Sequence, residues 1–209
     1  LDALVRMQVR PLFMVHDLIP ITHPEYCREG EESRHRRRMR GALRAAQAIV
    51  CNSRYTMERL AAFAMHEQLE MPRTIVAALA SGLERRAVAQ GEGACTADDA
   101  DEVAGPGHFV CIGTIEPRKN HVLLLQVWRR LVDLLGAATP RLVLVGQTGW
   151  ECEHVLRTLE RSAGLRAVVE LRDACSDAQL RALMRSAHAL LMPSHEEGFG
   201  MPVIEAIEL

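Results

Sequence analysis

Two short segments of the sequence combine glycine, charge and a helix start as an anion-binding site requires. The first, Gly113 to His121, reads GTIEPRKNH. Gly113 follows an apolar run, where a glycine lets a ligand approach the backbone closely. Arg118 and Lys119 stand where the next helix is expected to begin, and two cations beside the free N–H groups of a helix start favour phosphate. A solvated basic helix start is the alternative, and this pattern alone leaves both interpretations open.

The second segment, Ser194 to Glu205, reads SHEEGFGMPVIE. It places acids after a strand, then a Gly-x-Gly loop, and Pro202 at the start of a helix. The loop glycines let backbone N–H groups face a ligand. Glu197 and Glu205 are eight positions apart, and we expect both to face one cleft, where carboxylates would accept hydrogen bonds from sugar hydroxyls. The alternative is a capping acid and a surface helix acid.

Two further segments are candidates on weaker grounds. His16 and Asp17 follow the apolar run PLFMV, where a histidine could hold a substrate or move a proton, although a lone histidine is often structural. Arg34 to Arg40 contains five arginines in seven positions. This run could meet anionic lipid or a phosphate-bearing acceptor, or it could be an ordinary solvated helix face.

The elements that must position these residues alternate between short apolar strands and longer helices. Such alternation, with strands that are apolar almost throughout, predicts an α/β fold whose parallel sheets are covered on both faces. In such sheets ligands bind at the carboxyl ends of the strands. Each of the four segments above follows a predicted strand. Strands are expected within 11–19, 49–52, 72–79, 108–115, 141–145, 168–171 and 189–192, and helices over 34–48, 55–63, 120–135, 151–163 and 177–187 and from Pro202. We expect Gly164 to stop the fourth helix, and Ser53 and Ser176 to be N-caps, Ser176 in a capping box with Gln179.

Composition sets the domain organisation and excludes several classes of protein. The chain has 209 residues, and the stretch from Val88 to Gly107 is rich in Gly, Ala and acids. We therefore predict one domain over 1–87, a linker or mobile loop over 88–107, and a second domain over 108–209. A net charge of −2 and 4% aromatic residues argue against a nucleic-acid partner. The six cysteines are scattered without metal-site spacing, which predicts reduced thiols, buried at Cys51 and Cys111.

Together these segments resemble the retaining glycosyltransferases of family 4, which have the GT-B fold and an E-x7-E motif. EGFGMPVIE, from Glu197 to Glu205, matches that motif. FVCIGTIEPRKNHVLLLQVW matches the start of the donor-binding domain, followed in order by RLVLVGQTGW and SDAQLRALMRSAHALLMPS. HDLIPITHPEY and IVCNSRYT resemble the late part of the acceptor-side domain. The resemblance implies two Rossmann-like parallel-sheet domains facing a cleft, both incomplete in this chain.

The resemblance also implies roles for individual residues. Arg118 and Lys119 would neutralise the donor diphosphate as the glycosidic bond breaks, without a metal or other cofactor. Glu197 would contact the donor sugar, Glu205 the ribose, and His16, beside Asp17, the acceptor side. The backbone of Phe199, Gly200 and Met201, with Gly113 and Thr114, would complete the donor site. Many relatives have arginine where this chain has Thr114, so we expect Arg118 to take over part of that role.

The substrates and location follow from the resemblance as expectations. HDLIP with EPRKN resembles the mannosyltransferase branch, so GDP-mannose is the first donor expected and a UDP-sugar the second. The acceptor would be a polysaccharide or a lipid-linked saccharide, with transfer in the cytoplasm and peripheral contact with the inner membrane surface as an option. The alternatives are a GT-B epimerase or hydrolase of nucleotide sugars and a non-catalytic nucleotide-sugar-binding protein.

Overall fold

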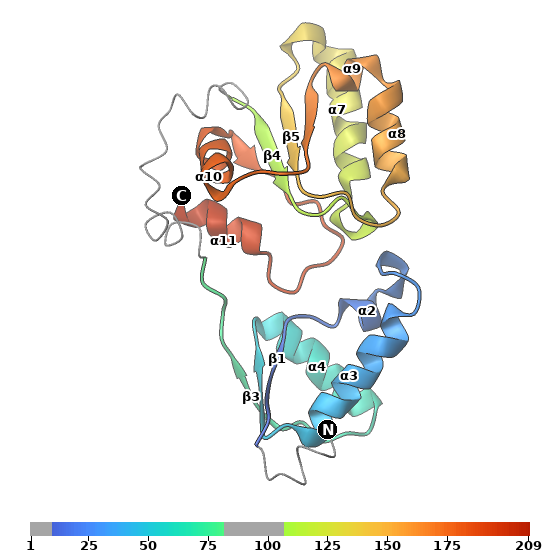
Figure 1. Cartoon of the computed structure of the whole chain (residues 1–209), viewed down its shortest axis with the longest axis vertical. Coiled ribbons are helices and arrows are strands. Elements are labelled where there is room, and N and C mark those ends of the chain that lie inside the picture. Colours follow the sequence, from blue (N-terminus) through green and yellow to red (C-terminus); the bar gives the residue numbers. More distant parts are fainter. Residues whose placement is uncertain (1–9, 82–106) are drawn as a thin grey trace. The chain divides into compact units, whose positions relative to one another are not determined.

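The computed structural model describes residues 10–81 and 107–209, which form two compact units (Figure 1). Unit 1 comprises residues 10–80 together with Glu196–Gly200. Unit 2 comprises Ser81, residues 107–195 and Met201–Leu209. The predicted linker, 88–107, lies outside the described residues except for Gly107. The prediction placed all of 108–209 in the second domain, whereas Glu196–Gly200 belongs by its contacts to unit 1.

Unit 1 is a three-stranded parallel sheet with helices packed on one face. The strands are β1 (Leu12–Val15), β2 (Ala48–Cys51) and β3 (Arg73–Val76), in the order β1-β2-β3. The helices are α2 (Ile19–Thr22), the 3-10 turn η1 (Pro24–Tyr26), α3 (Glu31–Ala45) and α4 (Arg54–His66). Side chains from β1, β2, α3 and α4 form its core, with Ile49 and Leu60 fully buried at the centre.

The basic run of α3 is largely engaged in ion pairs within unit 1. Arg36 and Arg40 both bind the carboxylate of Glu67, which follows α4 and is only 7% exposed. Arg36 also pairs with Glu32, and Arg34 pairs with Glu31. The hydrogen bonds from Arg40 and Arg36 lower the pKa of Glu67. Arg36 and Arg40 therefore tie α3 to the end of α4. That the run meets anionic lipid or a phosphate-bearing acceptor stays a prediction.

Unit 2 is a four-stranded parallel sheet in the order β6-β5-β4-β7. Its strands are β4 (Phe109–Ile112), β5 (Leu142–Val145), β6 (Val169–Arg172) and β7 (Ala189–Leu190). Its helices are η2 (Pro117–Lys119), α7 (His121–Leu135), η3 (Gly136–Ala138), α8 (Glu153–Arg161), α9 (Ala163–Arg166), α10 (Asp177–Ser186) and α11 (Met201–Glu208). In Figure 1, α7, α8 and α9 lie on one side of the sheet and α10 on the other.

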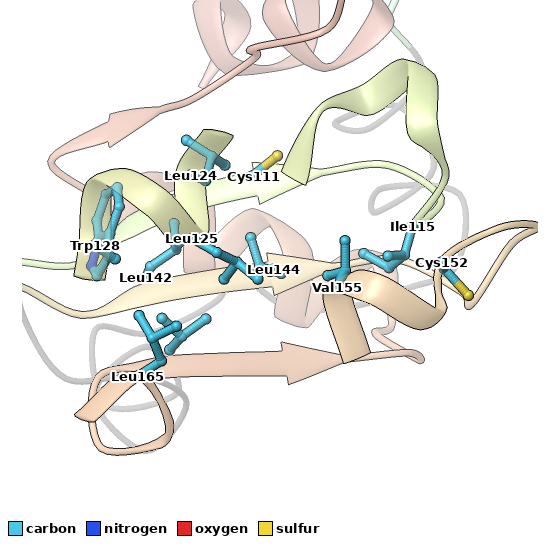
Figure 2. Close-up of a cluster of buried hydrophobic side chains, with 11 residues drawn as sticks. Cys111, Ile115, Leu124, Leu125, Trp128, Leu142, Leu144, Cys152, Val155 and Leu165 are labelled. Carbon is cyan, nitrogen blue, oxygen red and sulfur yellow. The ribbon is translucent and has the colours of Figure 1, made fainter. Parts of the chain in front are cut away.

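Alternate residues of β5 face opposite cores, which is why both sides of this sheet are covered. Leu142 and Leu144 pack with Leu124, Leu125 and Trp128 of α7 and with residues of α8 and α9 (Figure 2). On the other face, β4 and β5 pack against α10. The four residues of β5 are all buried, as expected for the interior strand of a doubly covered sheet.

Most predicted elements are present, but several predicted helix ends are wrong. The helix predicted over 34–48 spans Glu31–Ala45, and the one predicted over 55–63 continues to His66. Ser53 and Ser176 cap α4 and α10, the latter in the expected capping box. Helix α8 ends at Arg161, before Gly164, because the Ser162 side chain caps the separate helix α9, which contains Gly164. Cys51 and Cys111 are buried free thiols, as predicted, and burial raises the pKa of Cys111 to about 11.

Within 10–81 and 107–209, none of the helices combines the length and hydrophobicity that a membrane span requires.

Candidate functional site

The carboxyl end of β4 in unit 2 carries the predicted anion-binding segment. A side chain at Gly113 would bring its Cβ to 3.1 Å from Cε of Lys119, so the lysine lies directly across this glycine. At Gly146, after β5, a Cβ would lie 2.1 Å from the Gly113 carbonyl oxygen. The backbones after β4 and β5 therefore approach closely, and Lys119 lies beside them at the sheet edge where α/β proteins bind ligands.

Arg118 is held in position through both its side chain and its backbone. Its guanidinium donates to the Glu116 carboxylate at 2.7 Å, and both side chains are mostly buried. Its carbonyl oxygen accepts from the backbone N–H of His195 at 2.9 Å. Asn120 has φ 55° and donates its side-chain amide to the carbonyl of Pro193 at 3.2 Å. The PRKN turn is thus tied to the segment that follows β7.

His121, the first residue of α7, is a feature of this region that the sequence analysis did not single out. It is 1% exposed, and neither ring nitrogen has a hydrogen-bond partner in the described structure. Burial, with a smaller contribution from Lys119, lowers the pKa of His121 to about 4. At neutral pH the ring is therefore uncharged, and the positive charge of the PRKN turn comes from Arg118 and Lys119. Its place two residues after Lys119 was the only signal that the sequence offered.

Of the other predicted donor-side residues, Thr114 lies in the loop after β4, and Met201 and Glu205 lie on α11. The remaining three belong to unit 1 by their contacts: Glu197, Phe199 and Gly200. Thr114 is exposed, whereas Glu205 and Met201 on α11 are half-buried. Ala206 and Leu209 pack against the core on the α10 side of the sheet, which anchors this segment within unit 2. Gly200, just before α11, has φ 81°, a conformation that favours glycine.

In unit 1 the motif loop packs directly on the segment after β1. A Cβ at Gly198 would lie 2.3 Å from the carbonyl oxygen of His16, so only glycine fits there. The Gly198 carbonyl accepts from the hydroxyls of Ser53 at 2.8 Å and Thr56 at 3.3 Å. Thr56 is also 3.1 Å from the His16 carbonyl. The N-terminus of α4 therefore holds the His16 backbone and the motif loop together.

The side chains around this loop are polar and well positioned. Asp17 accepts the backbone N–H of Ile19 at 3.0 Å, which fixes the start of α2. Glu196 lies 3.4 Å from His23, and its hydrogen bond with Tyr55 raises the pKa of that phenol. Glu197 is half-buried beside the exposed His16 segment. The structure thus brings Glu197 and His16 into one region of unit 1, and places Glu205, Arg118 and Lys119 in unit 2. That Glu197 and Glu205 share a cleft remains a prediction.

Comparison with protein families assigns the class. Residues 97–209 match the model of the glycosyl transferases group 1 family. This match spans more than half of the chain. The chain therefore belongs to the glycosyl transferases group 1 family. The GT-B fold is likewise confirmed: a trehalose-phosphate synthase from Burkholderia xenovorans matches 99% of this chain and 52% of its own length, with a TM-score of 0.69 and 13% identity. A sucrose-phosphate synthase from Thermosynechococcus elongatus gives 0.68 at 18% identity.

Among named relatives, the chain is similar to two mannosyltransferases of Escherichia coli. It is 28% identical over 207 residues to the serotype-specific mannosyltransferase WbdA, covering 94% of this chain. Over 106 residues it is 34% identical to O-antigen chain mannosyltransferase B, covering 51% of this chain. The chain spans only 24% and 27% of the lengths of these relatives.

Proposed function

We propose that this chain supplies the donor site and part of the acceptor side of a mannosyltransferase that builds a surface polysaccharide. One observation carries the proposal: in a member of this family, Arg118 and Lys119 stand at the carboxyl edge of a parallel sheet, with Lys119 across Gly113. The similarity to two mannosyltransferases, one of them an O-antigen enzyme by its name, supports mannose and a saccharide acceptor. GDP-mannose is the first donor and a UDP-sugar the second.

The chemistry is electrostatic stabilisation of a leaving group. As the bond between the sugar and the donor diphosphate breaks, negative charge develops on the diphosphate, and Arg118 and Lys119 neutralise it in place of a metal ion. The acceptor hydroxyl attacks the anomeric carbon from the side that the diphosphate leaves, so the configuration is retained. Its proton passes to the departing phosphate oxygen. Glu197 accepts hydrogen bonds from the sugar hydroxyls, Glu205 from the ribose, and His16 orients the acceptor side.

A transfer assay tests this function. The protein is incubated with GDP-mannose, a mannose oligosaccharide and a chelator, and the anomeric configuration of the product is read by NMR. We expect an α-linked product, lost in Glu197→Ala and kept in the control Glu153→Ala, whose carboxylate is exposed on α8. Transfer that strictly requires Mg²⁺, or an inverted product, would contradict the mechanism.

Two other outcomes would select the alternatives. Release of free mannose without transfer to the oligosaccharide would favour the hydrolase or epimerase. Nucleotide-sugar binding without turnover, unchanged in Glu197→Ala, would favour a binding protein. A peripheral position at the cytoplasmic face of a membrane fits a lipid-linked acceptor and stays part of the proposal.

A further inference from the structure

Unit 2 has a groove between α7 and α8, on the outer side of the helices that cover the sheet. Its deeper part has a volume of about 250 Å³, and a wider part of about 430 Å³ adjoins it. Arg129, His154 and Thr158 line both parts, so they form one continuous hollow, here called the α7–α8 groove. None of its lining residues belongs to the proposed donor site.

The floor of the groove is apolar. Leu125 of α7 and Leu165 of α9 are 2% and 1% exposed, and Val122 is half-buried beside them. The polar side chains that line the same part are Gln126, Arg129, His154 and Thr158. A recessed aliphatic floor of this kind accepts an apolar side chain that projects into it, and burial of that side chain would provide binding free energy.

The rim of the groove is basic. His154, Arg157, Thr158 and Arg161 follow one another on a single face of α8 at helical spacing and extend over about 10 Å. Arg129 faces them from α7 and donates to the Ser162 hydroxyl at 3.5 Å. Asp133 lies one turn further along α7.

Within the described part of the chain, none of these rim arginines forms an ion pair with a carboxylate. The nearby Asp133 is no exception. By contrast, two other arginines of unit 2, Arg141 and Arg172, both bind Glu170. Three cations that line one hollow with an apolar floor, without a carboxylate partner among residues 10–81 and 107–209, are complementary to a ligand with several negative charges and an apolar group.

We infer that the α7–α8 groove binds an acidic peptide segment of a partner protein, which places an apolar side chain on the floor and carboxylates on the arginines. The arginines form a row along α8, and this matches carboxylates spaced three or four residues apart on a helical peptide. A bilayer is the weaker candidate, because surface-bound helices insert protruding apolar side chains, whereas Leu125 and Leu165 are recessed.

Selection from a random 12-residue peptide display library against the whole chain tests the inference. We expect the enriched peptides to combine acids at this spacing with a large apolar residue. Their affinity is then measured by fluorescence anisotropy on a double variant, Arg157→Glu with Arg161→Glu. Loss of two partly exposed ion pairs predicts binding weaker by about tenfold or more. A matched control, Arg37→Glu with Arg130→Glu, has the same net charge but alters exposed arginines outside the groove, and should bind as the parent does.

Two further measurements keep the inference falsifiable. Thr158→Trp should fill the deep part of the groove and weaken the binding of the same peptides. In the second measurement, peptides with Lys in place of the acids should bind the double variant more tightly than the parent. Enriched peptides without acids, or equal affinity for parent and double variant, would overturn the inference. Binding to phosphatidylglycerol vesicles that depends on Arg157 and Arg161, with no peptide selected, would also overturn it and assign the groove to a membrane.

Discussion

The sheets of the two units differ in how their faces are covered. In unit 2 one face packs on α7, α8 and α9 and the other on α10. In unit 1 the helices cover one face, while on the other Leu12 is 65%, Met14 45% and Ile75 49% exposed within the described residues. Because Met14 and Ile75 both align with Val50 in register, these side chains form an apolar surface. Parallel sheets are normally buried on both faces, so unit 2 should be the more stable unit.

The largest expected effect is the loss of core packing in unit 2. Leu144 is fully buried at the centre of the sheet, so Leu144→Ala should lower the free energy of unfolding by about 2–5 kcal/mol. Both tryptophans, Trp128 and Trp150, lie in unit 2, so their fluorescence in urea reports this unit. Leu12→Ala, the control in unit 1, should leave this transition within about 0.5 kcal/mol. Equal losses in both variants would invalidate the comparison.

A second expected effect is a pH dependence specific to unit 2. Because the pKa of His121 is about 4 when folded and near 6.5 when unfolded, the unfolded state binds the proton first as the pH falls. Unit 2 should therefore be most stable above pH 6.5 and lose up to about 3 kcal/mol between pH 6.5 and 4. Urea titrations of His121→Phe over this range should show a flatter slope, whereas the exposed-residue control His66→Gln should keep the parent slope. An unchanged slope in His121→Phe would rule out this origin.

The smallest expected effect concerns the uncovered face of unit 1. Leu12→Lys should change the free energy of unfolding by less than about 0.5 kcal/mol, because the side chain is already exposed. It should reduce self-association measured by light scattering, since a charge interrupts the apolar surface. Val203→Lys, on a partly exposed position of α11, serves as the matched control. More self-association in Leu12→Lys than in the parent would contradict this view of the surface.

Local signals allowed prediction of much of the fold. The Ser53 cap and the Ser176 capping box each depend on residues three positions apart, and strand apolarity marked β4 and β5. Gly164 misled the prediction, because a new cap at Ser162 starts a second helix one residue after α8 ends. The packing of Gly198 on the His16 carbonyl joins positions far apart in the sequence, and no local pattern reports it.

The candidate site was predicted unevenly for the same reason. Arg118 and Lys119 were identifiable because a glycine, two cations and a helix start are neighbours in sequence. Two features became visible only in the folded structure. The ring nitrogens of His121 have no hydrogen-bond partner among the described residues, and the Asn120 side chain donates a hydrogen bond to the Pro193 carbonyl. The arginine row of α8 looks in sequence like an ordinary solvated helix face, and only the apolar floor from α7 and α9 distinguishes it.

Calorimetric titration of GDP, UDP and ADP into the protein with a chelator present is the decisive test of the donor site. We expect saturable binding of one nucleotide, GDP first, and a greater loss of affinity for GDP than for guanosine in Lys119→Ala. Arg130→Ala, an exposed arginine on α7, should bind as the parent does. Equal losses for GDP and guanosine in Lys119→Ala, or unchanged GDP binding, would contradict the assignment of Lys119 to the donor diphosphate.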